Sequence, residues 1–154
     1  MRDTLPAPKS YSIHRVSITG EPPKHRAVPR PNPVSYRGGL PGGALQRVRA
    51  YIDAHLGEHI TLEDLARQVG VSRFHFAREF RHSTGESPME YLRRVRIQYS
   101  LRLLLRRDAT IGQVAARLGF ADQSHFTRIF VRLIGMPPGA FLCRNAWTSN
   151  DGAA

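Results

Sequence analysis

The stretch TLEDLARQVGVSRFHFAREFRHSTG, residues 61–85, returns 49 residues later as TIGQVAARLGFADQSHFTRIFVRLIG, residues 110–135. An internal repeat is a strong clue to architecture, because a duplicated sequence implies a duplicated structural unit. Each copy is typical of two short helices joined by a tight turn, the helix-turn-helix pattern, and is too short to bury a core of its own. The repeat therefore predicts an all-α fold built from two helix-turn-helix subdomains.

The two copies align with a single change of register. Before the turn they match at an offset of 49, as in Gly70 and Gly119, and after it at an offset of 50, as in Phe80 and Phe130. The second copy therefore carries one extra residue. We place it in the turn, within Phe120–Gln123, because loops tolerate insertions best.

Apolar spacing and capping residues predict where the helices lie. A first helix is expected over 42–56, ended by Gly57. The run Ser87-Pro88-Met89-Glu90 is typical of a helix start, with serine at the cap, proline first and glutamate third. The expected order is a first helix-turn-helix at 44–85, a connecting helix at 88–106, a second helix-turn-helix at 110–135 and a closing helix at 138–144.

The connecting helix bears directly on function. It would be roughly 28 Å long at 1.5 Å per residue, and Tyr99, Leu103 and Leu105 make it apolar on more than one side, as suits a helix covered by a subdomain at each end. B-DNA presents the same face of its major groove after about 34 Å. Two recognition helices held by a stiff connector could therefore enter successive segments of the groove on one side of a duplex.

Composition divides the chain into three parts. Eight of the 11 prolines lie in residues 1–41, which carry a net charge of +5 and few large apolar side chains. Such a segment does not bury enough apolar surface to offset its ordering entropy, so we expect a disordered basic arm. Residues 42–145 form the folded domain, and 146–154 a frayed tail.

The charge indicates a polyanionic partner. The formal net charge is +11, and 21 of the 23 basic residues are arginine. Arginine favours bidentate contacts with phosphates and with guanine edges, and a basic chain of this kind is typical of nucleic-acid binding.

Several other classes of function find no support in the sequence. The single cysteine, Cys143, excludes a disulfide within the chain and a cysteine-rich zinc site. His55 and His59 are four apart, but Gly57 interrupts a helix between them and no third ligand follows. We find no phosphate-binding loop, apolar membrane-length run or signal sequence. We therefore expect a soluble, cytoplasmic protein that is not an enzyme and needs no cofactor or metal.

From Leu45 to Arg144 the chain resembles the DNA-binding domain of AraC/XylS-type bacterial transcription regulators. The core GF-x-DQSHF-x-R-x-F-x-R-x-x-G-x-x-P of the second repeat carries most of the likeness. The resemblance implies a sequence-specific regulator of double-stranded DNA, associated with the nucleoid, that activates transcription by recruiting RNA polymerase. The chain has no room for the sensing domain usual in the family, so no small-molecule effector site is evident, and it resembles small stand-alone members or a fragment. At 99–101 it has Tyr-Ser-Leu where the family more often shows Arg-Ala-Arg.

Outward residues near the start of a recognition helix reach base edges. On the two predicted recognition helices, Arg73–Ser83 and Gln123–Leu133, these residues are Arg73, Phe74, Ala77, Arg78, Gln123, Ser124, Thr127 and Arg128. The resemblance points to Phe74 and Arg78 as base readers, suited to a thymine methyl and to guanine, while glutamine suits adenine. Otherwise Phe74 would be a core aromatic, Arg78 a solvated charge and Gln123 a hydrated amide.

Backbone phosphates call for further cations, which give affinity without sequence choice. The candidates are Arg81, Arg93, Arg94, Arg96 and Arg132. Two alternative functions stay open: a protein-interaction module that retains the helix-turn-helix fold, and a non-specific nucleic-acid binder that acts through the basic arm.

Overall fold

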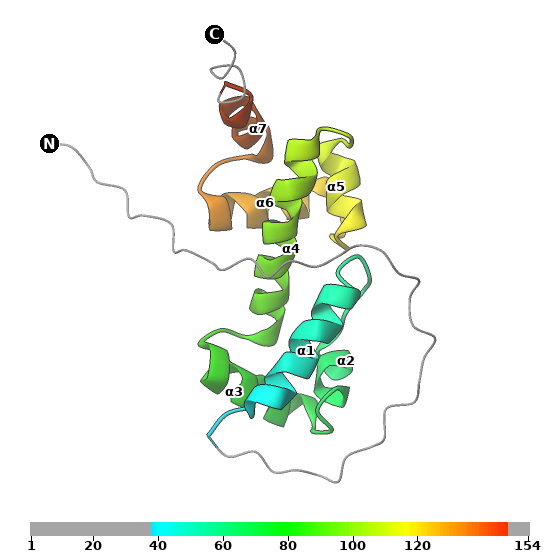
Figure 1. Ribbon diagram of the computed structural model, residues 1–154, viewed down its shortest axis with the longest axis vertical. Coiled ribbons are helices and arrows are strands. Elements are labelled where there is room, and N and C mark those ends of the chain that lie inside the picture. Colours follow the sequence, from blue (N-terminus) through cyan, green and yellow to red (C-terminus); the bar gives the residue numbers. More distant parts are fainter. Residues whose placement is uncertain (1–37, 148–154) are drawn as a thin grey trace, which may run out of the picture.

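The structure, a computed structural model, describes residues 38–147, and all regular structure in that range is helical (Figure 1). This confirms the predicted all-α class. The helices in chain order are α1 Gly42–Ala54, α2 Leu62–Arg67, α3 Arg73–Thr84, α4 Pro88–Arg106, α5 Ile111–Arg117, α6 Gln123–Ile134 and α7 Pro138–Trp147. Residues 1–37 of the expected arm, and 148–154 of the tail, lie outside the described residues.

The sequence repeat is a structural repeat. Gly70 and Gly119 follow α2 and α5 with φ of +71° and +67°, a left-handed conformation that glycine adopts at no steric cost. The caps of the next helices, Ser72 and Asp122, lie two and three residues further on. The extra residue of the second copy thus lies in its turn, as predicted.

Each subdomain has its own hydrophobic core, and α4 belongs to both. Figure 1 shows α1, α2 and α3 around one half of α4, and α5, α6 and α7 around the other. Leu92 and Val95 of α4 pack in the first core, whereas Ile97 and Leu104 pack in the second. Tyr99 packs against both. The prediction that a subdomain covers the connecting helix at each end is confirmed, although Leu105 is 49% exposed and covered by neither.

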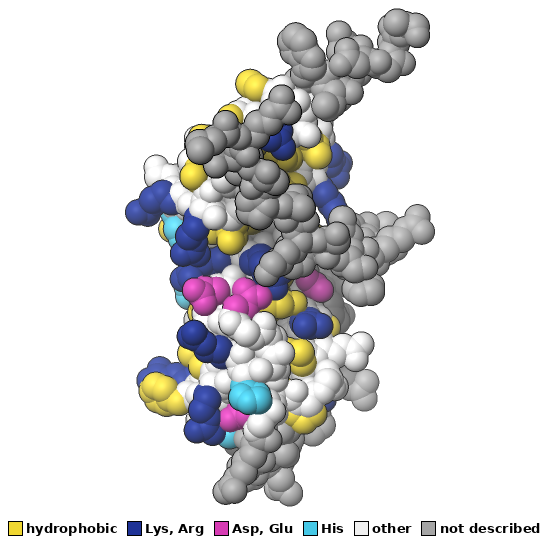
Figure 2. All heavy atoms as spheres, turned by 90° about the vertical axis from the view of Figure 1, so that its left-hand side faces the viewer, with side chains coloured by type: hydrophobic (Ala, Val, Ile, Leu, Met, Phe, Trp, Pro, Cys, Tyr) yellow, Lys and Arg dark blue, Asp and Glu magenta, His cyan; other side chains and the backbone are white. Residues whose placement is uncertain are grey.

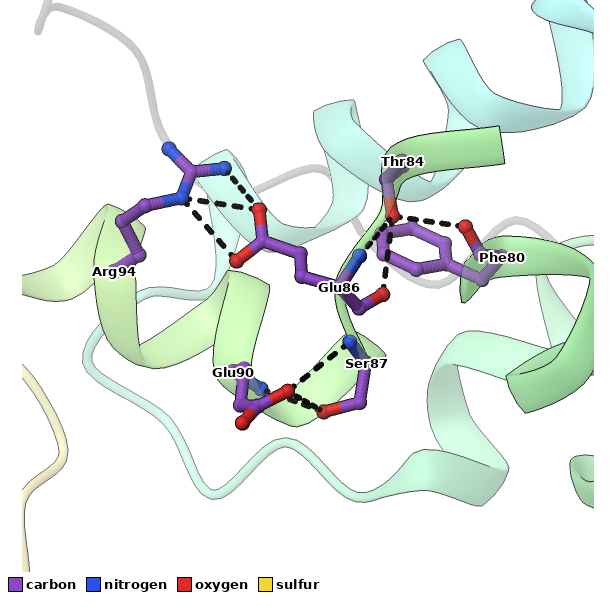
Figure 3. Close-up of polar contacts among 6 residues, drawn as sticks. All are labelled: Phe80, Thr84, Glu86, Ser87, Glu90 and Arg94. Carbon is purple, nitrogen blue, oxygen red and sulfur yellow. Dashed lines mark hydrogen bonds and ion pairs between the residues drawn. The ribbon is translucent and has the colours of Figure 1, made fainter. Parts of the chain in front are cut away.

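The turn between α3 and α4 determines how the first recognition helix meets the connector (Figure 3). The Thr84 hydroxyl donates to the Phe80 carbonyl at 2.8 Å, and Ser87 and Glu90 form the predicted capping box at the start of α4. Hydrogen bonds from Ser87 lower the pKa of Glu90, so its carboxylate stays ionised and accepts the Ser87 backbone N–H, which the helix leaves unpaired.

Three boundaries differ from the prediction. The first helix ends at Ala54, and Gly57 is not in a left-handed conformation. Instead a Cβ at Gly57 would stand 2.7 Å from the Arg117 carbonyl oxygen, so glycine is required there by a close approach between the subdomains. The closing helix runs on to Trp147. Leu40, expected in the arm, is buried in the first core.

The chain enters the domain against the first recognition helix. The Gly39 N–H donates to the Glu79 carboxylate at 2.8 Å, and the Leu40 N–H to the Ser83 hydroxyl at 2.7 Å. Both acceptors belong to α3. Residues 39–40 are therefore part of the folded domain, and a basic arm can extend only from residues N-terminal to them.

The division of α4 between two cores gives a matched test. Ile97→Ala should lower the unfolding free energy by about 2–5 kcal/mol, because Ile97 is fully buried. Leu105→Ala, two turns further along the helix, should cost less than about 0.5 kcal/mol. Urea unfolding followed by circular dichroism measures both. Equal losses at the two positions would contradict the placement of Ile97 in the second core and of Leu105 outside both cores.

Candidate nucleic-acid interface

The start of α3 presents an aromatic ring to solvent. Ser72 caps the helix by accepting from the His75 N–H, and Phe74 on the first turn is 75% exposed. The Arg73 guanidinium lies over its ring, 4.9 Å from the centroid. Phe76 and Phe80 fill the core positions of this helix. Phe74 is therefore not a core aromatic, and its ring is available to a partner.

Arg78 is oriented by two contacts of its guanidinium and remains largely exposed. Its Nε donates to Glu79 Oε1 at 2.9 Å, and its Nη2 lies 3.2 Å from His75 Nδ1. Glu79 is buried, and hydrogen bonds from Gly39 and Arg78 lower its pKa, so it stays a carboxylate. The Arg78 side chain is nonetheless 71% exposed. The contacts at Nε and Nη2 orient the guanidinium, while most of the side chain stays exposed to a ligand. Ala77, on the same helix, is partly buried.

The start of α6 is built in the same way, but without a counterpart of Glu79. Asp122 caps it, accepting from the His125 N–H at 2.7 Å as expected of a cap. The predicted contact residues lie on its first turns, three exposed and Thr127 partly buried: Gln123, Ser124, Thr127 and Arg128. Arg128 occupies the same helical position as Arg78, the sixth, but Ile129 stands where the first copy has Glu79.

The arginines late in the two recognition helices share a neighbour. Arg81 of α3 and Arg132 of α6 are both exposed, and the charge of each helps to lower the pKa of Glu90 at the start of α4. The charges of both arginines thus act on the same carboxylate. Figure 2 shows one face on which arginine side chains are spread along the long axis, with Asp and Glu side chains between them near its middle.

The arginines of α4 differ in their availability. Arg93 is partly buried. Arg94 forms an ion pair with Glu86, with Nη2 2.6 Å from Oε1 (Figure 3), so a phosphate would have to compete with that carboxylate. Arg96 is only 8% exposed, and its guanidinium donates to three backbone carbonyls. The prediction that Arg96 contacts phosphate is therefore wrong.

The burial of Arg96 has a signal in the sequence, although the prediction of a phosphate contact overlooked it. Leu92, Arg96, Ser100 and Leu104 recur at intervals of four, and all four are buried. An arginine in a stripe of core positions is expected to point inward and to need internal acceptors. The burial of Glu79 was also overlooked. It lies three residues after Phe76 and next to Phe80, so it too falls on the core side of its helix.

The described residues also bear on a metal site and on a membrane span. Within residues 38–147 no group of three or more His, Cys, Asp or Glu side chains could hold a metal ion. His55 instead hydrogen-bonds through Nδ1 with the Tyr51 carbonyl at 2.8 Å. In the same range no single helix is long and apolar enough to cross a membrane; α6 and α7 meet that criterion only as a pair bent by 59°.

Comparisons with known proteins agree with this geometry. The profile of the helix-turn-helix domain family matches residues 65–144. The MmsAB operon regulatory protein of Pseudomonas aeruginosa is 31% identical over 97 residues, which are 63% of this chain and 32% of that protein. The transcriptional activator RhaR of Klebsiella pneumoniae is 35% identical over 101 residues, 66% of this chain and 36% of that protein.

A solved structure shows the same arrangement of helices. The DNA-binding domain of the global transcriptional factor AdpA, in complex with a target DNA, matches with a TM-score of 0.64 and 32% identity, covering 72% of this chain and 98% of that chain. The present chain spans about a third of the length of the two curated relatives. Profile, sequence and fold together show that the chain belongs to the AraC-type family of helix-turn-helix transcription regulators and contains its DNA-binding domain.

Proposed function

We propose that this chain recognises a specific sequence in double-stranded DNA by inserting α3 and α6 into successive major-groove segments on one face of the duplex. The observation that carries the proposal is that two equivalent recognition helices, α3 and α6, pack against one connecting helix and each carries an exposed arginine at its sixth position, in the fold of a domain solved on DNA. Two such helices on a common connector suit one flank of a polyanion.

The base readers follow from exposure and chemistry. Phe74 offers an apolar ring to a thymine methyl. Arg78 offers its exposed guanidinium to guanine O6 and N7, with Nη2 exchanging its contact with His75 for one with the base. On α6, Gln123 suits adenine and Arg128 suits guanine. The remaining contacts at the two helix starts come from Arg73, Ala77, Ser124 and Thr127.

The phosphate contacts come from cations on three helices. Because Arg96 is buried, the remaining candidates are Arg81, Arg93, Arg94 and Arg132. Such contacts set position and affinity but carry no sequence information. The Glu90 carboxylate repels phosphate. We therefore place the DNA phosphate backbone on either side of this carboxylate and not over it.

The biological role is inferred from the family and from named relatives. AdpA was solved on a target DNA, and RhaR is named a transcriptional activator. We infer that this chain acts in the same way, as an activator that recruits RNA polymerase to DNA in the cytoplasm, without enzymatic activity. A protein-interaction module is the second candidate, and binding to duplex DNA with sequence preference separates the two.

Two arginine variants test the division between base and phosphate contacts. Arg78→Ala should cost about 1–3 kcal/mol at particular base pairs and relax the preference there, because a bidentate contact to guanine is lost. Arg132→Ala should weaken binding to all duplexes alike and reduce the salt slope by about one. Gel shifts with a selected and a scrambled duplex, across a salt series, measure both effects.

The same gel shifts include a control and a contrary outcome. Arg106→Ala removes an exposed arginine on α4 that pairs with Asp108, outside the proposed interface, and should change neither quantity. An unchanged ratio of specific to non-specific affinity in Arg78→Ala would remove Arg78 from the base readers.

Deletion of residues 1–37 tests whether the basic arm does the binding. The deletion removes a net charge of +5 but keeps Gly39 and Leu40, which hydrogen-bond to α3. We expect weaker binding with sequence preference retained, since the base readers stay in place. Complete loss of duplex binding, with helix content unchanged by circular dichroism, would support the non-specific alternative.

A further inference from the structure

Arg96 lies where the two subdomains meet. Its neighbours in sequence belong to different cores, Val95 to the first and Ile97 to the second. Its Nε donates to the Leu56 carbonyl at 3.0 Å and its Nη2 to the Glu58 carbonyl at 2.6 Å, both between α1 and α2. Its Nη1 donates to the Gly119 carbonyl at 2.9 Å, between α5 and α6. One guanidinium therefore joins a loop of the first subdomain to the turn of the second helix-turn-helix.

The hydrogen-bond acceptors of this guanidinium are all backbone carbonyls, and its carbon also lies 5.9 Å from the centroid of the Phe120 ring. Among the described residues no carboxylate lies within ion-pair distance of Arg96. The three acceptors lie shortly after the C-terminal ends of α1 and α5, where carbonyls lack helical partners and the helix dipole favours a cation. Burial lowers the pKa of Arg96, but arginine stays protonated in proteins. Removal of the side chain would leave three carbonyls without these donors.

Two glycines allow the backbones to come this close. A Cβ on Gly119 would stand 2.7 Å from Arg96 Nη2 and 3.1 Å from the Glu58 oxygen. A Cβ on Gly57 would stand 2.7 Å from the Arg117 carbonyl oxygen. The loop before α2 and the turn before α6 are thus in direct contact, with the guanidinium between them. We call the Arg96 side chain with the carbonyls of Leu56, Glu58 and Gly119 the Arg96 junction.

We propose that Arg96 is a positioning residue that fixes the angle and separation of the two recognition helices, and with them the half-site spacing that the protein accepts. Each subdomain has its own core, so the junction is not needed to fold either one. The turn that contains Gly119 leads directly into α6, and the loop at Leu56–Glu58 leads into α2 of the first helix-turn-helix. A shift at the junction therefore changes how α6 is placed relative to α3. The statement about half-sites rests on the proposed DNA binding, whereas the statement about helix placement does not.

The first test measures helix placement without DNA. In the full chain with Cys143→Ser, the exposed His82 of α3 and Leu133 of α6 are changed to cysteine and spin-labelled. Double electron–electron resonance should give one narrow distance distribution with Arg96 in place. Arg96→Met, similar in length but without donors, should broaden or shift it, and Arg96→Lys should do so too, since an ammonium lacks the planar fork. Arg102→Met, an exposed arginine on the same helix, should leave it narrow.

Each contrary result of this test is decisive. A distribution that stays narrow and unshifted in Arg96→Met would overturn the positioning role. A loss of helix content by circular dichroism in both Arg96 variants would overturn it as well, because Arg96 would then be required for folding itself.

The second test measures spacing. A duplex recovered with the unaltered protein is compared with versions whose half-sites are two base pairs closer or further apart, and with a single half-site. The unaltered protein should lose affinity steeply on either change. Arg96→Met should bind the original duplex more weakly, lose less on either change, and bind the single half-site as before. If the spin labels report altered helix placement but the spacing preference is unchanged, the half-site statement fails and the positioning role stands. If neither the unaltered protein nor any variant binds duplex DNA, the proposed function fails instead.

Discussion

The structure depends on one constraint: neither hydrophobic core can close without α4, and α4 is continuous. Leu92 and Val95 complete the first core, and Ile97 and Leu104 complete the second, within 13 residues of one helix. A helix of this length transmits position with little bending. The two helix-turn-helix units are therefore carried on one continuous connector, on which we propose that the Arg96 junction sets their angle. A single chain can thereby present two recognition helices at a set separation, an arrangement that simpler helix-turn-helix proteins reach by dimerising.

Acidic residues give order to a strongly basic surface. Glu79 holds the stem of Arg78 and also accepts the Gly39 N–H, so the entering chain and the proposed base reader share one carboxylate. Glu86, in the turn before α4, forms an ion pair with Arg94 of α4. Glu90 completes the capping box at the start of α4, and the charges of Arg81 and Arg132 help to lower its pKa. Side chains that are held before binding lose less conformational entropy on contact with DNA, which favours selectivity over non-specific attraction.

The fold could be predicted from the sequence because the signals for it are local. The repeat, the extra residue in its second turn and the capped helix start at Ser87 each act within a few residues, and the structure confirms them. The errors concern contacts between segments distant in sequence. Gly57 was interpreted as a helix end, whereas it admits the Arg117 carbonyl, and Arg96 was assigned to phosphate, whereas its acceptors lie 23 to 40 residues away. The exposure of Phe74 could not be derived from its residue type, since a phenylalanine beside core aromatics at 76 and 80 fits either face. The DNA contacts themselves stay predictions.

Selection of bound sites from a random pool of duplexes, carried out with the unaltered chain, tests the central claim most directly. If α3 and α6 enter successive major-groove segments on one face, the recovered sequences will contain two conserved half-sites whose centres lie about 10–10.5 base pairs apart. Recovery of a single half-site, or of two whose centres are half a helical turn apart and so face opposite sides of the duplex, would contradict the account.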